Sequence, residues 1–188
     1  MEELPAKQNI LEVFTDDWKF SLSDPNVNLM TKRAFQCVVV AVYSKAGSYL
    51  GHFSDPPTDI SEVSSAPGDK VLSEMLDDIK TNIDPSVAFV WVGGSTSTSE
   101  DAYAVDDEAR EILARPIDNF NYVKQKLIEA GFNEDNIVTA MSGHNEEVEV
   151  SLNTGDGQIN VNTVKEEPEP SMYHKQEYWD FKRESKSD

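Results

Sequence analysis

Short runs of β-branched and aromatic residues alternate with turn residues along the first half of the chain. The clearest pattern is a hairpin, in which the apolar runs 35–43 and 49–53 are joined by Ser-Lys-Ala-Gly-Ser, with a glycine suited to a turn. Residues 11–20 mix apolar and polar positions as an edge strand or a strand pair does. The apolar run 86–92, ended by two glycines, predicts a short buried strand.

Two stretches carry apolar residues at helical spacing. Within 71–83 the helical set is Val71, Leu72, Met75, Ile79 and Ile83. Pro85 ends this helix, and the Pro-, Ser- and Asp-rich stretch 54–70 before it predicts a surface loop. Within 119–130, one face carries Phe120, Val123 and Leu127, and Gly131 suits a left-handed C-terminal cap.

The later part of the chain has the alternation of strands. Strands are predicted in 136–143, 146–153 and 158–164, with a Thr-Gly-Asp-Gly turn between the last two. In 146–153 the residues predicted to face one side are Val148, Val150 and Leu152, and those predicted to face the other are Glu147, Glu149 and Ser151.

At 188 residues the chain is long enough for one domain, which we place at 1–164, with a polar insertion at 95–116. After Lys165 the sequence is charge-dense and broken by prolines, so 165–188 is predicted to be a flexible tail. This tail contains aromatic residues that suit docking as a peptide, namely Tyr173, Tyr178, Trp179 and Phe181.

The charge balance excludes some partners. Sixteen basic and thirty-five acidic residues give a formal net charge of -19, which repels phosphate backbones and anionic lipids. The first residues lack a signal-peptide pattern, and no stretch approaches the roughly 20 apolar residues of a membrane span. A single cysteine forms no internal disulfide, in agreement with a reducing compartment. We therefore expect a cytoplasmic protein without nucleic-acid binding or membrane insertion.

The predicted hairpin carries the only cysteine, Cys37, and a histidine, His52. If the turn centres on residues 45 and 46, Ser54 lies opposite Cys37, and His52 is one diagonal step away on the same face, at about 7 to 8 Å. A cysteine attacks as its thiolate, and a histidine within reach supplies the base. A register shifted by one residue would instead place the two on opposite faces.

Cys37 and His52 also have a purely structural interpretation, which competes with the catalytic one. A cysteine next to three valines is often a small core residue, and a single histidine is often held by structural hydrogen bonds. The histidines His52, His144 and His174 have no ligand-like spacing, so no metal is expected.

The order of features along 31–164 resembles the CheD family of chemoreceptor glutamine deamidases, which share a fold with the catalytic domain of cytotoxic necrotizing factor and with YfiH-type proteins. Thr31 lies six residues before Cys37, which opens an apolar strand, and His52 follows across the hairpin. A helix and a strand ending in a double glycine come next, followed by a helix entered at Ile117 and Asn121 and a glycine-containing loop before the last hairpin.

The resemblance implies an α+β fold, a layered α/β/β/α sandwich of mixed sheets. It also implies catalytic residues Cys37, His52 and Thr31, in which Thr31 orients the imidazole. The substrate-binding positions that it implies are Gly93, Gly94, Asn121, Ser142 and Gly143, although the glycines also suit ordinary turns. The chain departs from the family at 32–36, where Lys-Arg-Ala-Phe-Gln replaces a glycine-rich stretch, and after Gly143, where His144 and two glutamates replace basic residues.

The implied activity is cysteine-dependent hydrolysis of a glutamine side chain in a protein substrate, without a metal or cofactor. Two alternatives remain open at this stage. One is an inactive CheD-like module that binds partners through its acidic surface and aromatic tail. The other is an amidohydrolase of small amides or peptides.

Overall fold

The computed structural model describes residues 8–34, 37–54, 67–95, 120–142 and 146–165. Its strands form two sheets. The four-stranded sheet has the order β1 (Asn9–Val13), β3 (Val27–Ala34), β8 (Glu146–Asn153) and β9 (Ile159–Lys165). The five-stranded sheet has the order β2 (Asp17–Leu22), β5 (Gly47–Ser54), β4 (Cys37–Tyr43), β6 (Phe89–Ser95) and β7 (Ile137–Ser142). Each sheet contains one parallel pair, β1 with β3 and β6 with β7, so both sheets are mixed.

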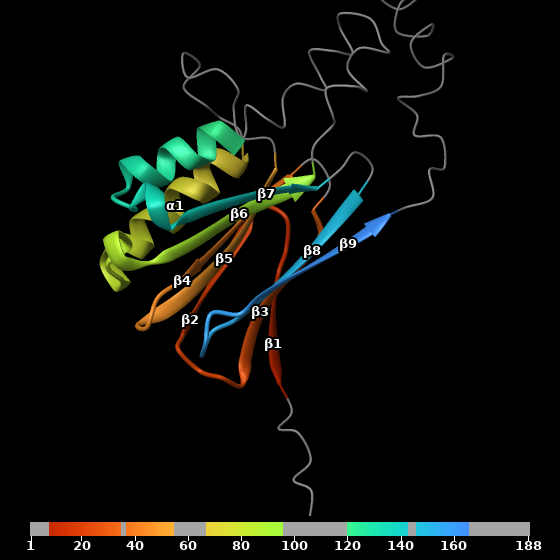
Figure 1. The fold of residues 1–188 in the computed structure, drawn as a ribbon, viewed down its shortest axis with the longest axis horizontal. Coiled ribbons are helices and arrows are strands. Elements are labelled where there is room, and N and C mark those ends of the chain that lie inside the picture. The colour runs from red at the N-terminus through yellow and green to blue at the C-terminus, as the bar shows by residue number, and fades with distance from the viewer. Residues whose placement is uncertain (1–7, 35–36, 55–66, 96–119, 143–145, 166–188) are drawn as a thin grey trace, which may run out of the picture.

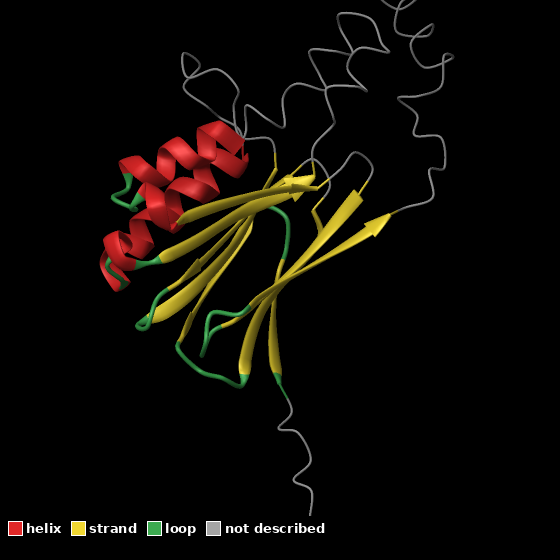
Figure 2. Ribbon diagram, viewed as in Figure 1, coloured by secondary structure: helices red, strands yellow, loops and turns green. Residues whose placement is uncertain are grey.

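Helices cover one face of the five-stranded sheet, and the four-stranded sheet packs on its other face (Figures 1 and 2). The helices are α1 (Pro67–Asn82) and a second helix whose described part spans 120–129. Short 3-10 turns at Pro85–Val87 and Glu134–Asn136 precede β6 and β7. The predicted α+β class is confirmed, and three layers of the expected sandwich are present. In the described parts of the chain, no helix covers the outer face of the four-stranded sheet.

Two hydrophobic clusters hold these layers together. One joins the helices to the five-stranded sheet through residues such as Val40, Met75 and Leu127, and the other joins the two sheets through Val39, Leu50 and similar residues. Strand β4 contributes to both clusters, which explains why its apolar residues run continuously instead of alternating with polar ones. Burial of each such side chain stabilises the fold by about 1.5 to 3 kcal/mol.

Several predicted elements are found with shifted boundaries. Helix α1 begins at Pro67, inside the predicted loop, because proline suits the first position of a helix, where its missing N–H is not needed. Strand β6 begins at Phe89, after a 3-10 turn, and includes both glycines. The apolar run predicted a strand at 86–92, whereas the two glycines lie inside the strand near its end, where the resemblance places them.

The later elements agree closely with the prediction. Phe120, Val123 and Leu127 are buried on one face of the second helix, and Gly131 ends it with a φ of 102°. In β8 the buried residues are Val148, Val150 and Leu152. Apart from Ser95, the predicted insertion lies outside the described residues, and so does the C-terminal tail after Lys165.

Candidate active site

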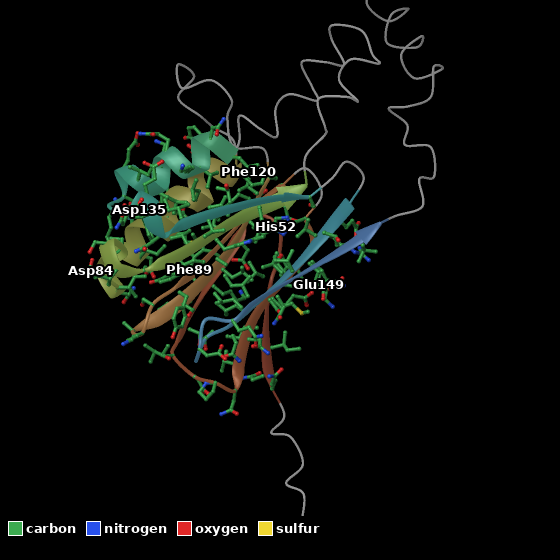
Figure 3. All side chains as sticks on the ribbon, viewed as in Figure 1. His52, Asp84, Phe89, Phe120, Asp135 and Glu149 are labelled. Atoms are coloured by element: carbon green, nitrogen blue, oxygen red, sulfur yellow. The ribbon has the colours of Figure 1, made fainter. Side chains whose placement is uncertain are left out.

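The β4–β5 hairpin places Cys37 and His52 on one face of the five-stranded sheet. Cys37 is paired directly with Ser54, and Val39 with His52, which is the register predicted from the turn. Directly paired residues of an antiparallel ladder share a face, so Cys37 and His52 are diagonal neighbours there. This face is the one that packs on the four-stranded sheet, and Figure 3 shows His52 between the two sheets. Cys37, the first residue of β4, is partly exposed.

Thr31 reaches His52 from the opposite sheet. Its Oγ1 lies 2.9 Å from Nδ1 of His52 and donates a hydrogen bond of 2.8 Å to the carbonyl oxygen of Val13. A hydroxyl has one hydrogen, so Thr31 must accept the second bond from the imidazole. This network assigns the hydrogen of the neutral ring to Nδ1 and leaves the lone pair on Nε2. The ring therefore offers an acceptor nitrogen on the side away from Thr31.

Burial controls the proton affinity of His52. The side chain is fully buried, and Nε2 has no hydrogen-bond partner among the residues that the structure describes. Desolvation lowers the pKa of His52 below its ordinary value, and the negative charge of Asp16 opposes this shift. The imidazole is accordingly neutral near pH 7, the protonation state that a general base requires. An unsatisfied buried nitrogen is uncommon in native proteins.

Asp16, in the β1–β2 turn, is part of the same site, although the sequence did not single it out. Its backbone N–H donates to the carbonyl oxygen of His52 at 2.7 Å. Its carboxylate accepts from the N–H and the hydroxyl of Ser54, at 2.9 Å and 2.7 to 2.8 Å. The only sequence signal was the pair Asp16-Asp17 in a turn, which is a common arrangement.

A β-bulge in β3 lies next to Thr31. The pairing of β3 with β8 shifts between Thr31 and Ala34, and Arg33 has a φ of 56°. As a result Thr31 and Ala34, three residues apart, are both buried. Bulges re-aim side chains, and this one lets Thr31 face His52 while the strand continues toward Cys37.

The two glycines of β6 allow close approaches beside β4. A Cβ on Gly94 would overlap the carbonyl oxygen of Cys37, and one on Gly93 would overlap the indole of Trp91. Ser142 donates a hydrogen bond of 3.0 Å to the carbonyl oxygen of Gly94. Thus Gly93 and Gly94 lie on β6, directly beside the strand that Cys37 opens, and Ser142 lies one strand further away, on β7.

The other predicted binding residues are Asn121 and Gly143. Asn121 is exposed in the first described turn of the second helix, next to Phe120, whose ring approaches Gly94. Gly143 lies outside the described residues. Among the described residues no group of three His, Cys, Asp or Glu side chains is arranged to hold a metal ion. None of the described helices has the length and apolar character needed to cross a membrane.

The fold and the site together define an α+β sandwich with a thiol, an imidazole and a hydroxyl near one end of its sheets. No protein-family model matches the chain, and no curated protein matches it. Among solved structures, it is similar to the C-terminal domain of CNFy from Yersinia pseudotuberculosis, with 11% sequence identity and a TM-score of 0.36. The match covers 82% of this chain and 62% of that chain.

Proposed function

We propose that the protein is a cysteine-dependent amidohydrolase that converts glutamine side chains of a protein substrate to glutamate. The observation that carries this proposal is the arrangement of His52. Its Nδ1 is held by Thr31, and its buried Nε2 is left without a described partner on the face that it shares with Cys37. This arrangement suits a general base beside a sulfur nucleophile whose imidazole is oriented by a third residue.

The first half of the proposed reaction forms a thioester. Nε2 of His52 takes the proton of the Cys37 thiol, and the thiolate sulfur attacks the carboxamide carbon of glutamine. When the tetrahedral intermediate collapses, the carbon–nitrogen bond breaks, and His52 returns its proton to the departing nitrogen, which leaves as ammonia. Thr31 keeps Nδ1 protonated, so that Nε2 is the nitrogen that gains and loses the proton.

The second half hydrolyses the thioester. Nε2 of His52 accepts a proton from water, the resulting hydroxide attacks the thioester carbon, the carbon–sulfur bond breaks, and His52 gives its proton to the departing sulfur. The products are a glutamate side chain and the regenerated thiol of Cys37. The net reaction consumes one glutamine and one water and releases one glutamate and one ammonia, so no metal, oxidant or cofactor takes part.

The choice of a protein glutamine as substrate rests on the sequence resemblance to the CheD family. The positions retained from that family are Thr31, Cys37 and His52. Two observations support them: Thr31 lies 2.9 Å from His52 across the two sheets, and Cys37 shares a face of the five-stranded sheet with His52. A CheD-like sandwich, a cytoplasmic location and a protein partner with an exposed glutamine belong to the same proposal. Free glutamine and small amides are the competing substrates.

The deciding experiment incubates the purified protein with candidate proteins, free glutamine and small amides, and measures released ammonia. Intact and peptide mass spectrometry then locates any glutamine converted to glutamate. We expect wild-type protein to release ammonia from an intact protein, and Cys37→Ser and His52→Ala to release none above background. Conversion that persists in Cys37→Ser would contradict the proposal, and release from free amides alone would reassign the substrate.

A further inference from the structure

We propose that Asp16 is a positioning residue of this site, which fixes the C-terminal end of β5 and supplies the negative charge that stabilises protonated His52. The catalytic consequence rests on the proposed function. The geometric claim does not, because the contacts of Asp16 with β5 exist whatever reaction the site performs.

Asp16 is connected to β5 through both its backbone and its side chain. The backbone N–H holds the carbonyl oxygen of His52 at 2.7 Å, and the carboxylate holds both hydrogen-bonding groups of Ser54. Since Ser54 is paired with Cys37, these bonds fix the strand segment that carries the base and faces the nucleophile. One residue thus anchors the two positions of β5 on which the geometry of the site depends.

The backbone conformation of Asp16 is unusual. Its φ of 55° lies in the left-handed region, where residues other than glycine are uncommon. Among the described residues, Asp16 and Arg33 are the non-glycine residues with positive φ, and they flank the contact between Thr31 and His52. Such conformations cost free energy, and they persist where surrounding contacts hold them, often at functional sites. Here the contacts that hold Asp16 are its backbone bond to His52 and the bonds that its carboxylate accepts from the N–H and the hydroxyl of Ser54.

The charges around His52 leave Asp16 as its principal electrostatic partner. Asp17 lies directly opposite His52 in β2, but its carboxylate forms an ion pair of 3.1 Å with Lys19. The inward-facing neighbours on the other packed strands are Thr31 of β3, Val39 and the Cys37 thiol of β4, Gly93 of β6, and Val148 and Val150 of β8. Asp16 forms no ion pair with any lysine or arginine in the described ranges, so its charge is not neutralised there.

The charge matters when His52 accepts a proton in a buried place. Protonation creates an imidazolium where burial disfavours it, and a nearby carboxylate offsets part of that cost. The same effect favours the pair formed by the Cys37 thiolate and protonated His52, because it stabilises the cation of that pair. Asp16 acts on the reaction through His52 and β5 and needs no contact with substrate.

The test measures the titration of His52 directly. NMR spectroscopy follows the ring C–H signals of His52 against pH in a Cys37→Ala background, with and without Asp16→Asn. Asparagine tolerates a positive φ and keeps an oxygen acceptor for Ser54, so this variant removes mainly the charge. We expect the pKa of His52 to fall by about 0.5 to 1 unit, and the signals of His144 and His174 to stay unchanged.

Two variants serve as controls. Asp17→Asn removes the neighbouring charge and is expected to leave the pKa of His52 nearly unchanged. If Asp16→Asn does not fold, Asp16→Gly removes the same charge in a residue well suited to the observed φ. An unchanged or raised pKa of His52 in the Asp16 variant, or an equal fall in Asp17→Asn, would overturn the proposal.

Alkylation of Cys37 by iodoacetamide near pH 7 gives a second measurement in the otherwise wild-type chain. We expect Asp16→Asn to slow alkylation by about 3- to 10-fold, the fold-change that corresponds to half a unit to one unit of pKa. An undiminished rate would overturn the proposal. Neither measurement requires deamidation, so failure of the proposed function leaves both results interpretable.

Discussion

Cys37 lies directly opposite Ser54 in the β4–β5 pair, and His52, two residues earlier on β5, faces the same side of the sheet. This relationship depends on the register of one hairpin, because a slip by one residue would turn one of the two side chains to the helical face. The close approach of Gly94 to the carbonyl of Cys37 and the bonds from Asp16 to Ser54 both oppose such a slip.

The reactivity of Cys37 tests the partnership with His52. We expect iodoacetamide to alkylate Cys37 at neutral pH, and His52→Ala to slow the reaction by about 10-fold or more, because an ordinary thiol is only a few per cent ionised there. Mass spectrometry of timed samples measures the rate. His174→Ala is the matched control and should react like wild type. A native thiol as inert as a core cysteine would refute this prediction.

Thr31→Val tests the bond that orients the imidazole. The change keeps the shape of the side chain but leaves Nδ1 of His52 and the carbonyl oxygen of Val13 without their partner, so we expect a loss of about 1 to 3 kcal/mol in the free energy of unfolding. Alkylation of Cys37 should also slow. Urea unfolding and timed alkylation measure the two effects. Thr31→Ser keeps the hydroxyl and should retain most of both properties, and equal behaviour of the two variants would argue against the assigned bond.

Gly94→Ala tests the packing behind Cys37. The added Cβ would overlap the carbonyl oxygen of Cys37, so we expect a loss of stability of about 1 to 3 kcal/mol and an altered alkylation rate. Gly131→Ala is a useful comparison, since it places alanine at a φ of 102° far along the chain from Cys37, at a cost of about 1 to 2 kcal/mol. Urea unfolding should show both losses, but only Gly94→Ala should change the reactivity of the thiol.

The pH dependence of stability follows from the lowered pKa of His52. At pH above the unfolded value of 6.5 the imidazole is neutral in both states, so burial of the neutral ring costs nothing extra. As the pH falls below 6.5 the unfolded state binds the proton first, and stability is lost progressively down to the folded pKa. Urea midpoints between pH 7 and 5 should therefore decrease more steeply for wild type than for His52→Gln. Parallel slopes would show that His52 titrates alike in both states.

Much of the fold follows from local patterns in the sequence. The turn length fixes the register of the β4–β5 hairpin, and helical spacing identifies α1 and the second helix, because these features depend on residues close together in the chain. Strand β3 was not predicted, since its Asn, Lys and Arg residues interrupt the apolar pattern and a bulge breaks the alternation. The sequence left Gly93 and Gly94 with two interpretations, substrate binding or an ordinary turn. It could not show that a Cβ at these positions would overlap Trp91 and the carbonyl oxygen of Cys37.

The site was predicted only in part. Diagonal placement of Cys37 and His52 could be worked out from the hairpin alone. The contact between Thr31 and His52 was expected from the family resemblance alone, because it joins strands of different sheets and the way two sheets pack leaves little trace in either strand. The role of Asp16 depends on a left-handed turn conformation that aspartate rarely adopts, so the sequence offered no reason to select it.

The bond between Thr31 and His52 makes the site sensitive to small changes in the distance between the two sheets. A separation of the two sheets too small to admit water to the core would already break this bond, while circular dichroism would still record every strand and helix. Under the proposed function, in which His52 controls the reactivity of Cys37, the alkylation rate of Cys37 would then change before any spectroscopic sign of unfolding. On that proposal, the thiol reports how closely the two sheets pack.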